Sequence, residues 1–175
     1  MLNILISFSR SYEKVPKEFA DFDPAHDFIK KLDENENFVK KDETYFNKQT
    51  GKEGRIILIS SDRSLKALAR ARSFSSDGTF KIAFKPLWSQ IMIIAAEVSP
   101  GIWVPVAFGF LPDKTLTAYL IFFGLVLQCL RELNLTLSAK TFMCDFEKGI
   151  RKAVLEIWPD LEIKGRILFF YQKLQ

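Results

Sequence analysis

Two aspartates stand where carboxylates could do chemistry. Asp77 opens a predicted strand in the segment Ser76-Asp-Gly-Thr-Phe80, and Asp145 closes another in Met143-Cys-Asp-Phe-Glu147. An unpaired carboxylate beside a buried strand is costly to desolvate, so each of them needs a partner. If the two strands are neighbours in a sheet, both carboxylates reach one point, where a hard divalent cation such as Mg²⁺ would find oxygen ligands. Two such ions can promote phosphoryl transfer.

A purely structural interpretation stays open from the residues alone. Asp77 would cap a turn before Gly78, and Asp145 would cap the helix that follows it. Glu147, at the start of the same helix, would serve the helix dipole rather than a metal ion.

The elements that would position the two aspartates begin near Arg55, after a charged stretch at residues 10–54 that we interpret as a polar lead-in, partly flexible. Ser61 can cap a short helix, and Asp113 or Thr115 can cap a longer one. Hydrophobic periodicity and turn residues predict strands at 55–60, 80–84, 91–98, 102–110, 140–144 and 163–171, and helices at 61–72, 116–133 and 146–158. This order, three sequential strands and then alternating helices and strands, predicts a mixed α/β sheet flanked by helices.

The helix at 116–133 is predicted to be the central buried helix of the domain. It is apolar nearly all round, which favours burial on more than one side. Its longest apolar stretch, from Leu116 to Leu130, is short for a membrane span. Its wide apolar face is predicted to cover Leu116, Leu120, Phe123, Leu127 and Leu130, with Ile121 and Val126 flanking.

Composition narrows the class of protein. Of the 175 residues, 48% are hydrophobic and 17 are Phe, which excludes disorder of the whole chain. With two cysteines and one histidine, a Cys/His zinc site is excluded and a reducing compartment is favoured. The start of the chain lacks a signal-peptide pattern, so we expect a nuclear or cytoplasmic protein that is not secreted. The net charge of +4 favours a polyanionic partner.

Several short blocks of the sequence resemble the transposase domain of Mutator-like elements (MULE). They lie in the same order as in that family, and the spacing between Asp77 and Asp145 is the one that the family leads us to expect. The blocks are Asp77-Gly-Thr-Phe-Lys81, Pro86-Leu87 with Gln90, Pro105 to Thr115 with Tyr119, Asp145-Phe-Glu-Lys148, and Lys164-Gly165 with Gln172.

This resemblance implies an RNase H-like fold over residues 55–175. Enzymes of that superfamily cut and join DNA with an Asp–Asp–Glu triad and two Mg²⁺ or Mn²⁺ ions. Asp77 would be the first acid and Asp145 the second, both as catalytic residues and as metal ligands. DNA would be the partner, and no membrane association is expected.

The sequence also departs from the family. Arg166 and Phe169 stand where the family often has Cys and His, and the third acid would lie beyond Gln175. The chain therefore resembles a partial domain, incomplete at its C-terminus, and we expect a transposase-derived protein that lacks catalytic activity. The alternative is a domesticated DNA- or protein-binding module without catalysis. A shortened domain would also expose apolar surface, which predicts self-association.

Basic residues could contact DNA phosphates. Arg63, Lys66 and Arg70 recur at helical spacing and share one face of the predicted helix 61–72. An ordinary solvated face is the alternative reading for these three. Lys81, four residues after Asp77, is a further candidate for nucleic-acid contact.

Overall fold

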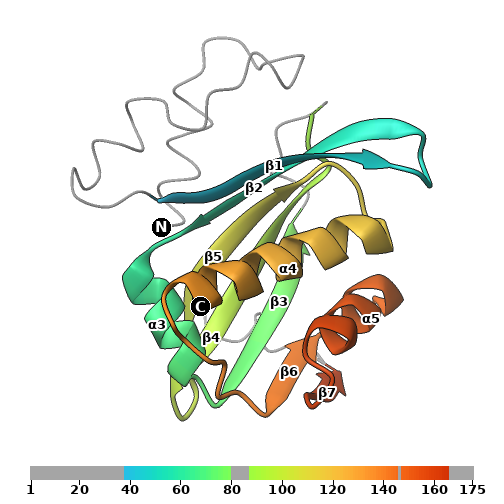
Figure 1. The fold of residues 1–175 in the computed structure, drawn as a ribbon. Helices are drawn as coiled ribbons and strands as arrows, with labels where there is room; N and C mark the ends of the chain where they lie inside the picture. The colour runs from blue at the N-terminus through green and yellow to red at the C-terminus, as the bar shows by residue number, and fades with distance from the viewer. Residues whose placement is uncertain (1–37, 80–86, 146, 166–175) are drawn as a thin grey trace, which may run out of the picture.

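The computed structural model describes residues 38–79, 87–145 and 147–165, which form a mixed α/β domain (Figure 1). Seven strands and three helices make up these residues. In chain order they are β1 (Val39–Asn47), β2 (Lys52–Ser60), α3 (Asp62–Arg70), β3 (Ser73–Thr79), β4 (Gln90–Ser99), β5 (Ile102–Leu111), α4 (Leu116–Glu132), β6 (Thr141–Cys144), α5 (Lys148–Ile157) and β7 (Glu162–Gly165).

The seven strands form one sheet in the order β1-β2-β5-β4-β3-β6-β7. The first five strands in this order pair with one another in antiparallel fashion. Strand β6 is parallel to both of its neighbours, β3 and β7. The parallel pairs are reached through α4 and α5, because a parallel connection needs a crossover rather than a tight turn. The predicted order of strands and helices from residue 55 onward is therefore confirmed.

All three helices contribute to one hydrophobic core on the same face of the sheet, with α4 lying across it (Figure 1). Alternate residues of β2 show how the sheet separates two cores. Ile56 and Leu58 pack beneath the helices, whereas Ile57 and Ile59 pack with Trp88 and Phe110 in a second cluster on the opposite face. A strand that is buried on both faces reads as a continuous apolar run, as the segment Ile56-Ile-Leu-Ile59 does.

The buried face of α4 differs from the predicted one. Phe123 and Leu130 are fully buried as expected, but Leu116, Leu120 and Leu127 are only half-buried. The buried positions are instead Ala118, Tyr119, Phe122, Phe123, Leu125, Val126, Cys129 and Leu130. Because the helix is apolar nearly all round, its periodicity alone could not fix which side meets the sheet.

Strand β3 begins earlier than the sequence predicted. The predicted strand 80–84 lies outside the described residues, and β3 occupies Ser73–Thr79. Asp77 is therefore inside a strand rather than at its opening, so it does not cap a turn. The hydrophobic pattern did not predict this strand because three of its buried residues are serines, namely Ser73, Ser75 and Ser76.

The ordered sheet also begins before Arg55. Residues 39–54, assigned to the lead-in by sequence, form β1 and the start of β2. Strand β1 is an edge strand with exposed charged side chains at Asp42 and Glu43, a pattern that resembles a solvated loop.

The last helix is shorter than expected. Helix α5 begins at Lys148, two residues later than predicted, and its Leu155 is exposed. Strand β7 is described over four residues, and the remainder of the predicted strand 163–171 lies outside the described residues.

Candidate functional site

Strands β3 and β6, which lead to the two aspartates, are parallel neighbours. Ser73 pairs with Thr141, Phe74 with Phe142 and Ser75 with Met143. Asp77 stands two residues beyond the last of these pairs in β3, and Asp145 directly follows the last residue of β6. Both aspartates therefore lie toward the carboxyl ends of two neighbouring strands, and the predicted approach of their carboxylates stays a prediction.

Both aspartates are exposed to solvent. Asp77, three residues after Phe74 in β3, falls by strand alternation on the face opposite the helices. Asp145 follows the last residue of β6, and its charge is one of the smaller causes that raise the pKa of Tyr119 on α4. The Oδ1 atom of Asp145 accepts a hydrogen bond of 3.3 Å from the backbone N–H of Glu147, which orients this carboxylate.

Asp77 and Asp145 are the candidate metal ligands. Mg²⁺ is commonly held by one or two protein carboxylates, the remaining positions being water or phosphate, so two exposed carboxylates could hold one such cation if their side chains converge. Within residues 38–79, 87–145 and 147–165, no third His, Cys, Asp or Glu joins them in a metal-binding group.

Glu147 lies close to Asp145 but is bound elsewhere. It occupies the N-cap position of α5, yet its side chain makes no capping hydrogen bond. Its carboxylate instead accepts a hydrogen bond from the Tyr119 hydroxyl of α4. Glu147 therefore stands at the start of α5, as the sequence predicted, without a side-chain capping hydrogen bond, and its carboxylate ties α5 to α4.

Tyr119 is the centre of a buried polar chain. The hydroxyl of Tyr119, which donates to Glu147, accepts from the Gln90 side-chain amide at 3.1 Å. The same Gln90 nitrogen also donates to the backbone carbonyl of Asp113 at 3.1 Å. Gln90 and Tyr119 are fully buried. This chain of hydrogen bonds therefore links β4, α4 and the start of α5.

The chain continues to the β1–β2 hairpin. The Asn47 amide donates to the Asp113 carboxylate and to the Thr115 hydroxyl, both at 3.0 Å. Asp113 also accepts from the Thr115 backbone N–H and hydroxyl. Thr115 in turn caps α4 by accepting from the Ala118 N–H, so Thr115 rather than Asp113 is the N-cap residue.

Burial and these contacts raise the pKa values of two nearby groups, the Tyr119 hydroxyl and the Cys144 thiol. Burial, and then the hydrogen bond to Glu147, raise the pKa of Tyr119 well above its usual range. Burial, with the charge of Asp145 as a smaller cause, raises the pKa of Cys144 to about 11. Tyr119 therefore remains a proton donor to Glu147, and Cys144 remains a neutral thiol at physiological pH.

Gln90 and Tyr119 belong to the blocks that resemble the family, but the sequence predicts no role for either residue. It also does not predict the hydrogen bonds of Asn47. A signal was available for Gln90, since an amide within an apolar strand must find hydrogen-bond partners once buried. No comparable signal marked Asn47, whose partners Asp113 and Thr115 are distant from it in the sequence.

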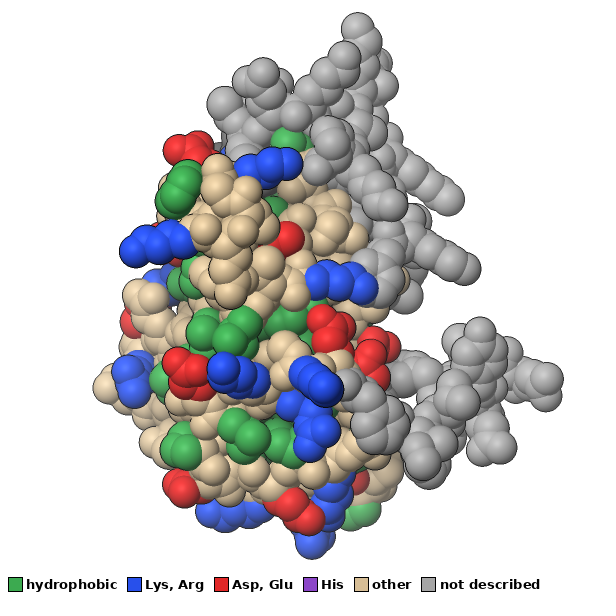
Figure 2. Space-filling model, turned by 90° about the vertical axis from the view of Figure 1, so that its right-hand side faces the viewer, with side chains coloured by type: hydrophobic (Ala, Val, Ile, Leu, Met, Phe, Trp, Pro, Cys, Tyr) green, Lys and Arg blue, Asp and Glu red, His purple; other side chains and the backbone are tan. Residues whose placement is uncertain are grey.

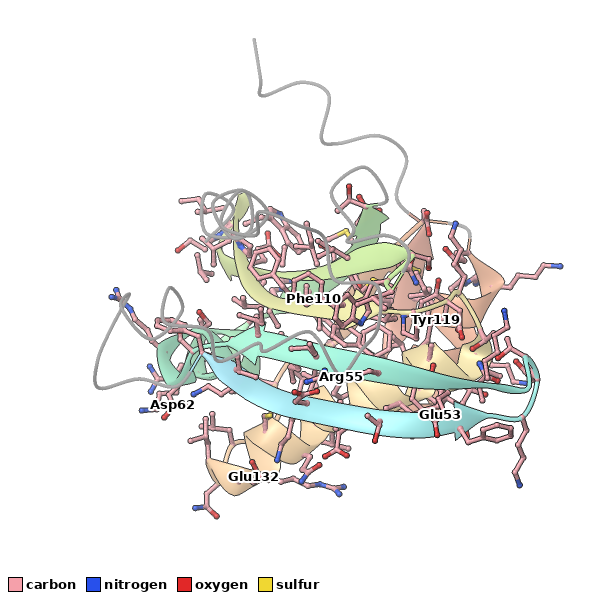
Figure 3. All side chains as sticks on the ribbon, turned by 90° about the horizontal axis from the view of Figure 1, so that it is seen from above. Glu53, Arg55, Asp62, Phe110, Tyr119 and Glu132 are labelled. Atoms are coloured by element: carbon pink, nitrogen blue, oxygen red, sulfur yellow. The ribbon has the colours of Figure 1, made fainter. Side chains whose placement is uncertain are left out.

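The predicted nucleic-acid residues lie at a different end of the sheet. Arg63, Lys66 and Arg70 are exposed on α3, which leads into the amino end of β3. Figure 3 shows Asp62, the first residue of α3, at the opposite end of the molecule from Tyr119. The structure therefore does not bring the basic face of α3 to the aspartates. Lys81 lies outside the described residues.

No helix within the described residues is long and apolar enough to cross a membrane. Comparison of the chain with protein families, curated proteins and solved structures found no match.

Proposed function

We propose that this chain is a transposase-derived domain with an RNase H-like fold, related to the MULE transposases, that binds a divalent cation through Asp77 and Asp145. The observation that supports the proposal is the parallel pairing of β3 with β6, the two strands that lead to Asp77 and Asp145. DNA transposition by two-metal phosphoryl transfer would need its first two acids on neighbouring strands of this kind.

The topology supports the same proposal. Three sequential antiparallel strands, β3, β4 and β5, are followed by a helix, a parallel strand, a second helix and a further parallel strand. This is the arrangement expected of an RNase H-like core. The β1–β2 hairpin and α3 are additions before that core, and the hairpin extends the sheet beside β5.

The contacts between motif blocks are a second line of support. Gln90, Asp113, Tyr119 and Glu147 belong to three of the blocks that resemble the family, and hydrogen bonds join them in one chain. The Glu147 backbone N–H also donates to the Asp145 carboxylate, so this chain reaches one of the two aspartates.

Bound Mg²⁺ or Mn²⁺ would supply positive charge to a phosphate and lower the pKa of a coordinated water. Asp77 and Asp145 would hold the cation, and the Glu147 N–H would keep the Asp145 carboxylate oriented toward it. Because Glu147 is held by Tyr119, it does not provide a third ligand among the described residues. We therefore propose that residues 1–175 bind one cation weakly and do not catalyse strand transfer.

Mn²⁺ titration followed by electron paramagnetic resonance tests the site. We expect the free-Mn²⁺ signal to fall on addition of the full chain, and Asp77→Asn and Asp145→Asn each to abolish that effect. Asp160→Asn is the matched control, because Asp160 is an exposed carboxylate next to the far end of α5. Equal Mn²⁺ binding by all three variants would exclude the proposed site and would favour a binding module without a metal.

A plasmid assay tests the absence of catalysis. Purified chain with supercoiled DNA and Mn²⁺ should give no nicking above background, because two carboxylates leave the second ion of a two-metal site without protein ligands. Nicking that disappears in both Asp77→Ala and Asp145→Ala would show instead that the active site is complete, with an acid such as Glu147 recruited to it.

A further inference from the structure

Helix α5 carries an exposed basic face that begins close to Asp145. Lys148, Arg151 and Lys152 occupy three of its first five positions, and all three side chains are exposed. Their spacing of three and four residues places them on one side of the helix. Because β6 ends at Cys144 and α5 begins at Lys148, the first residue of this face lies near the carboxyl end of β6.

These cations are unfavourably placed for the helix itself. The first turn of α5 contains no acidic residue, although Glu147 holds the N-cap position, so three positive charges stand near the positive end of the helix dipole. Lys148 and Lys152 also form a like-charged pair four residues apart, which destabilises a helix further. No ion pair among the described residues involves any of the three. An external anion would relieve this repulsion.

Other basic side chains of the structure are placed differently. Lys40, Lys41 and Arg55 pair with Asp62, Glu132 and Asp42 at 2.6 Å, so they are already compensated. The exposed cations of α3 lie at the amino end of β3, away from the aspartates. On the side that carries α5, Figure 2 shows Lys and Arg side chains close to Asp and Glu side chains.

We propose that Lys148, Arg151 and Lys152 bind the phosphate backbone of duplex DNA and hold it near Asp77 and Asp145. This inference rests on the proposed function for its choice of polyanion. From Lys148 to Lys152 the helix rises about 6 Å. One strand of DNA carries a phosphate for about every 3.4 Å of axial rise, so the three cations can contact two to three successive phosphates.

The experiment compares two triple variants of the full chain that remove the same charge. One is Lys148→Ala/Arg151→Ala/Lys152→Ala, and its matched control on α3 is Arg63→Ala/Lys66→Ala/Arg70→Ala. Binding to a fluorescent duplex of arbitrary sequence is measured by anisotropy in EDTA over a range of salt concentrations. Each lost phosphate contact reduces the slope of log K against log salt by about 0.9.

We expect the α5 variant to flatten this slope by roughly 2 to 3 and the α3 variant to leave it nearly unchanged. An equal loss in both variants, or a larger loss in the α3 variant, would overturn the proposal. So would absence of duplex binding by the unmodified chain, or tighter binding to anionic lipid vesicles that the α5 variant abolishes.

Two further measurements keep the outcome interpretable. If the triple α5 variant fails to fold, as judged by circular dichroism, Arg151→Ala is compared with Arg70→Ala, and a slope difference of about 1 is expected between them. Because DNA binding is measured in EDTA, it is independent of the Mn²⁺ titration. If the full chain binds DNA but not Mn²⁺, the proposed metal site alone is refuted. If it binds Mn²⁺ but not DNA, this inference alone is refuted.

Discussion

At the scale of single residues, Tyr119 shows how a buried polar side chain can connect elements. Its hydroxyl accepts from Gln90 and donates to Glu147, and its ring lies in the core beneath α4. Close packing accompanies these bonds, since a methyl group added at Gly149 would lie 3.1 Å from the Tyr119 ring. The start of α5 is therefore fixed to α4 both by a hydrogen bond and by ring contact.

Tyr119→Phe should destabilise the domain by about 1–3 kcal/mol, because it removes one hydroxyl and leaves buried polar groups of Gln90 and Glu147 without that partner. Urea denaturation followed by fluorescence measures the change in the free energy of unfolding. Tyr45→Phe is the control, since the Tyr45 hydroxyl takes no part in the hydrogen-bond chain from Gln90 through Tyr119 to Glu147. Equal losses in the two variants would contradict a structural role for the Tyr119 hydrogen bonds.

The two cysteines should resist thiol reagents in the folded protein. Cys144 is fully buried and its pKa is raised to about 11, while burial also raises the pKa of Cys129. At pH 8 the reactive thiolate is therefore scarce in the folded state, whereas an unfolded cysteine has a pKa near 8.5. We expect iodoacetamide labelling, followed by mass spectrometry, to be slow without urea and rapid in urea. Rapid labelling of Cys144 without urea would show that β6 opens readily.

The same raised pKa values have a consequence for stability at high pH. A thiol whose pKa is higher in the folded state than in the unfolded state contributes stability that is complete below the unfolded value. That contribution is lost as the pH rises toward the folded value. For Cys144 the affected window runs from about pH 8.5 to about pH 11, so the folded domain should weaken across it.

At the scale of secondary-structure elements, the sequence identified the elements whose burial gives a clear pattern and missed those whose burial does not. The run Ile56-Ile-Leu-Ile59 predicted β2 because both of its faces are covered. Strand β3 was placed late because its buried positions include serines, and β1 was missed because an edge strand exposes charge. The pairing of the strands that lead to Asp77 and Asp145 was predictable, but the Asn47 and Gln90 contacts depend on three-dimensional neighbours.

Helix α4 provides a test of which side is buried. Phe123 is fully buried and contacts the rings of Phe122, Phe142 and Trp158, whereas Leu127 is only half-buried. Phe123→Ala should therefore reduce the free energy of unfolding by about 3–5 kcal/mol. Leu127→Ala should cost clearly less, because part of its side chain is already exposed. Chemical denaturation of both variants measures the difference, and equal losses would mean that the helix is rotated from the orientation described.

At the scale of the whole molecule, the sheet joins two kinds of pairing. On one side, β1 with β2 and β4 with β5 form hairpins between strands that are close in sequence. On the other side, β6 reaches β3 only after the chain has passed through β4, β5 and α4. Asp77, Asp145 and the basic residues of α5 all come from this second side. The hydrogen bonds that Asn47 and Gln90 make to Asp113 come from the first side.

The long-range pairing of β3 with β6 has a kinetic consequence. Closing the long loop between these two strands costs more chain entropy than closing a hairpin, so this pair should form after the antiparallel strands. Strand β6 also has only four residues, and β7 beside it is largely exposed, so this region should open first. Hydrogen exchange should be faster in β6 than in the middle of β4 and β5, and Mn²⁺ should slow it selectively in β6. Equal protection of all strands would contradict this order. We therefore expect the strands that lead to Asp77 and Asp145 to pair late and reversibly. The apparent affinity for metal would then depend on the fraction of molecules in which β6 is paired with β3.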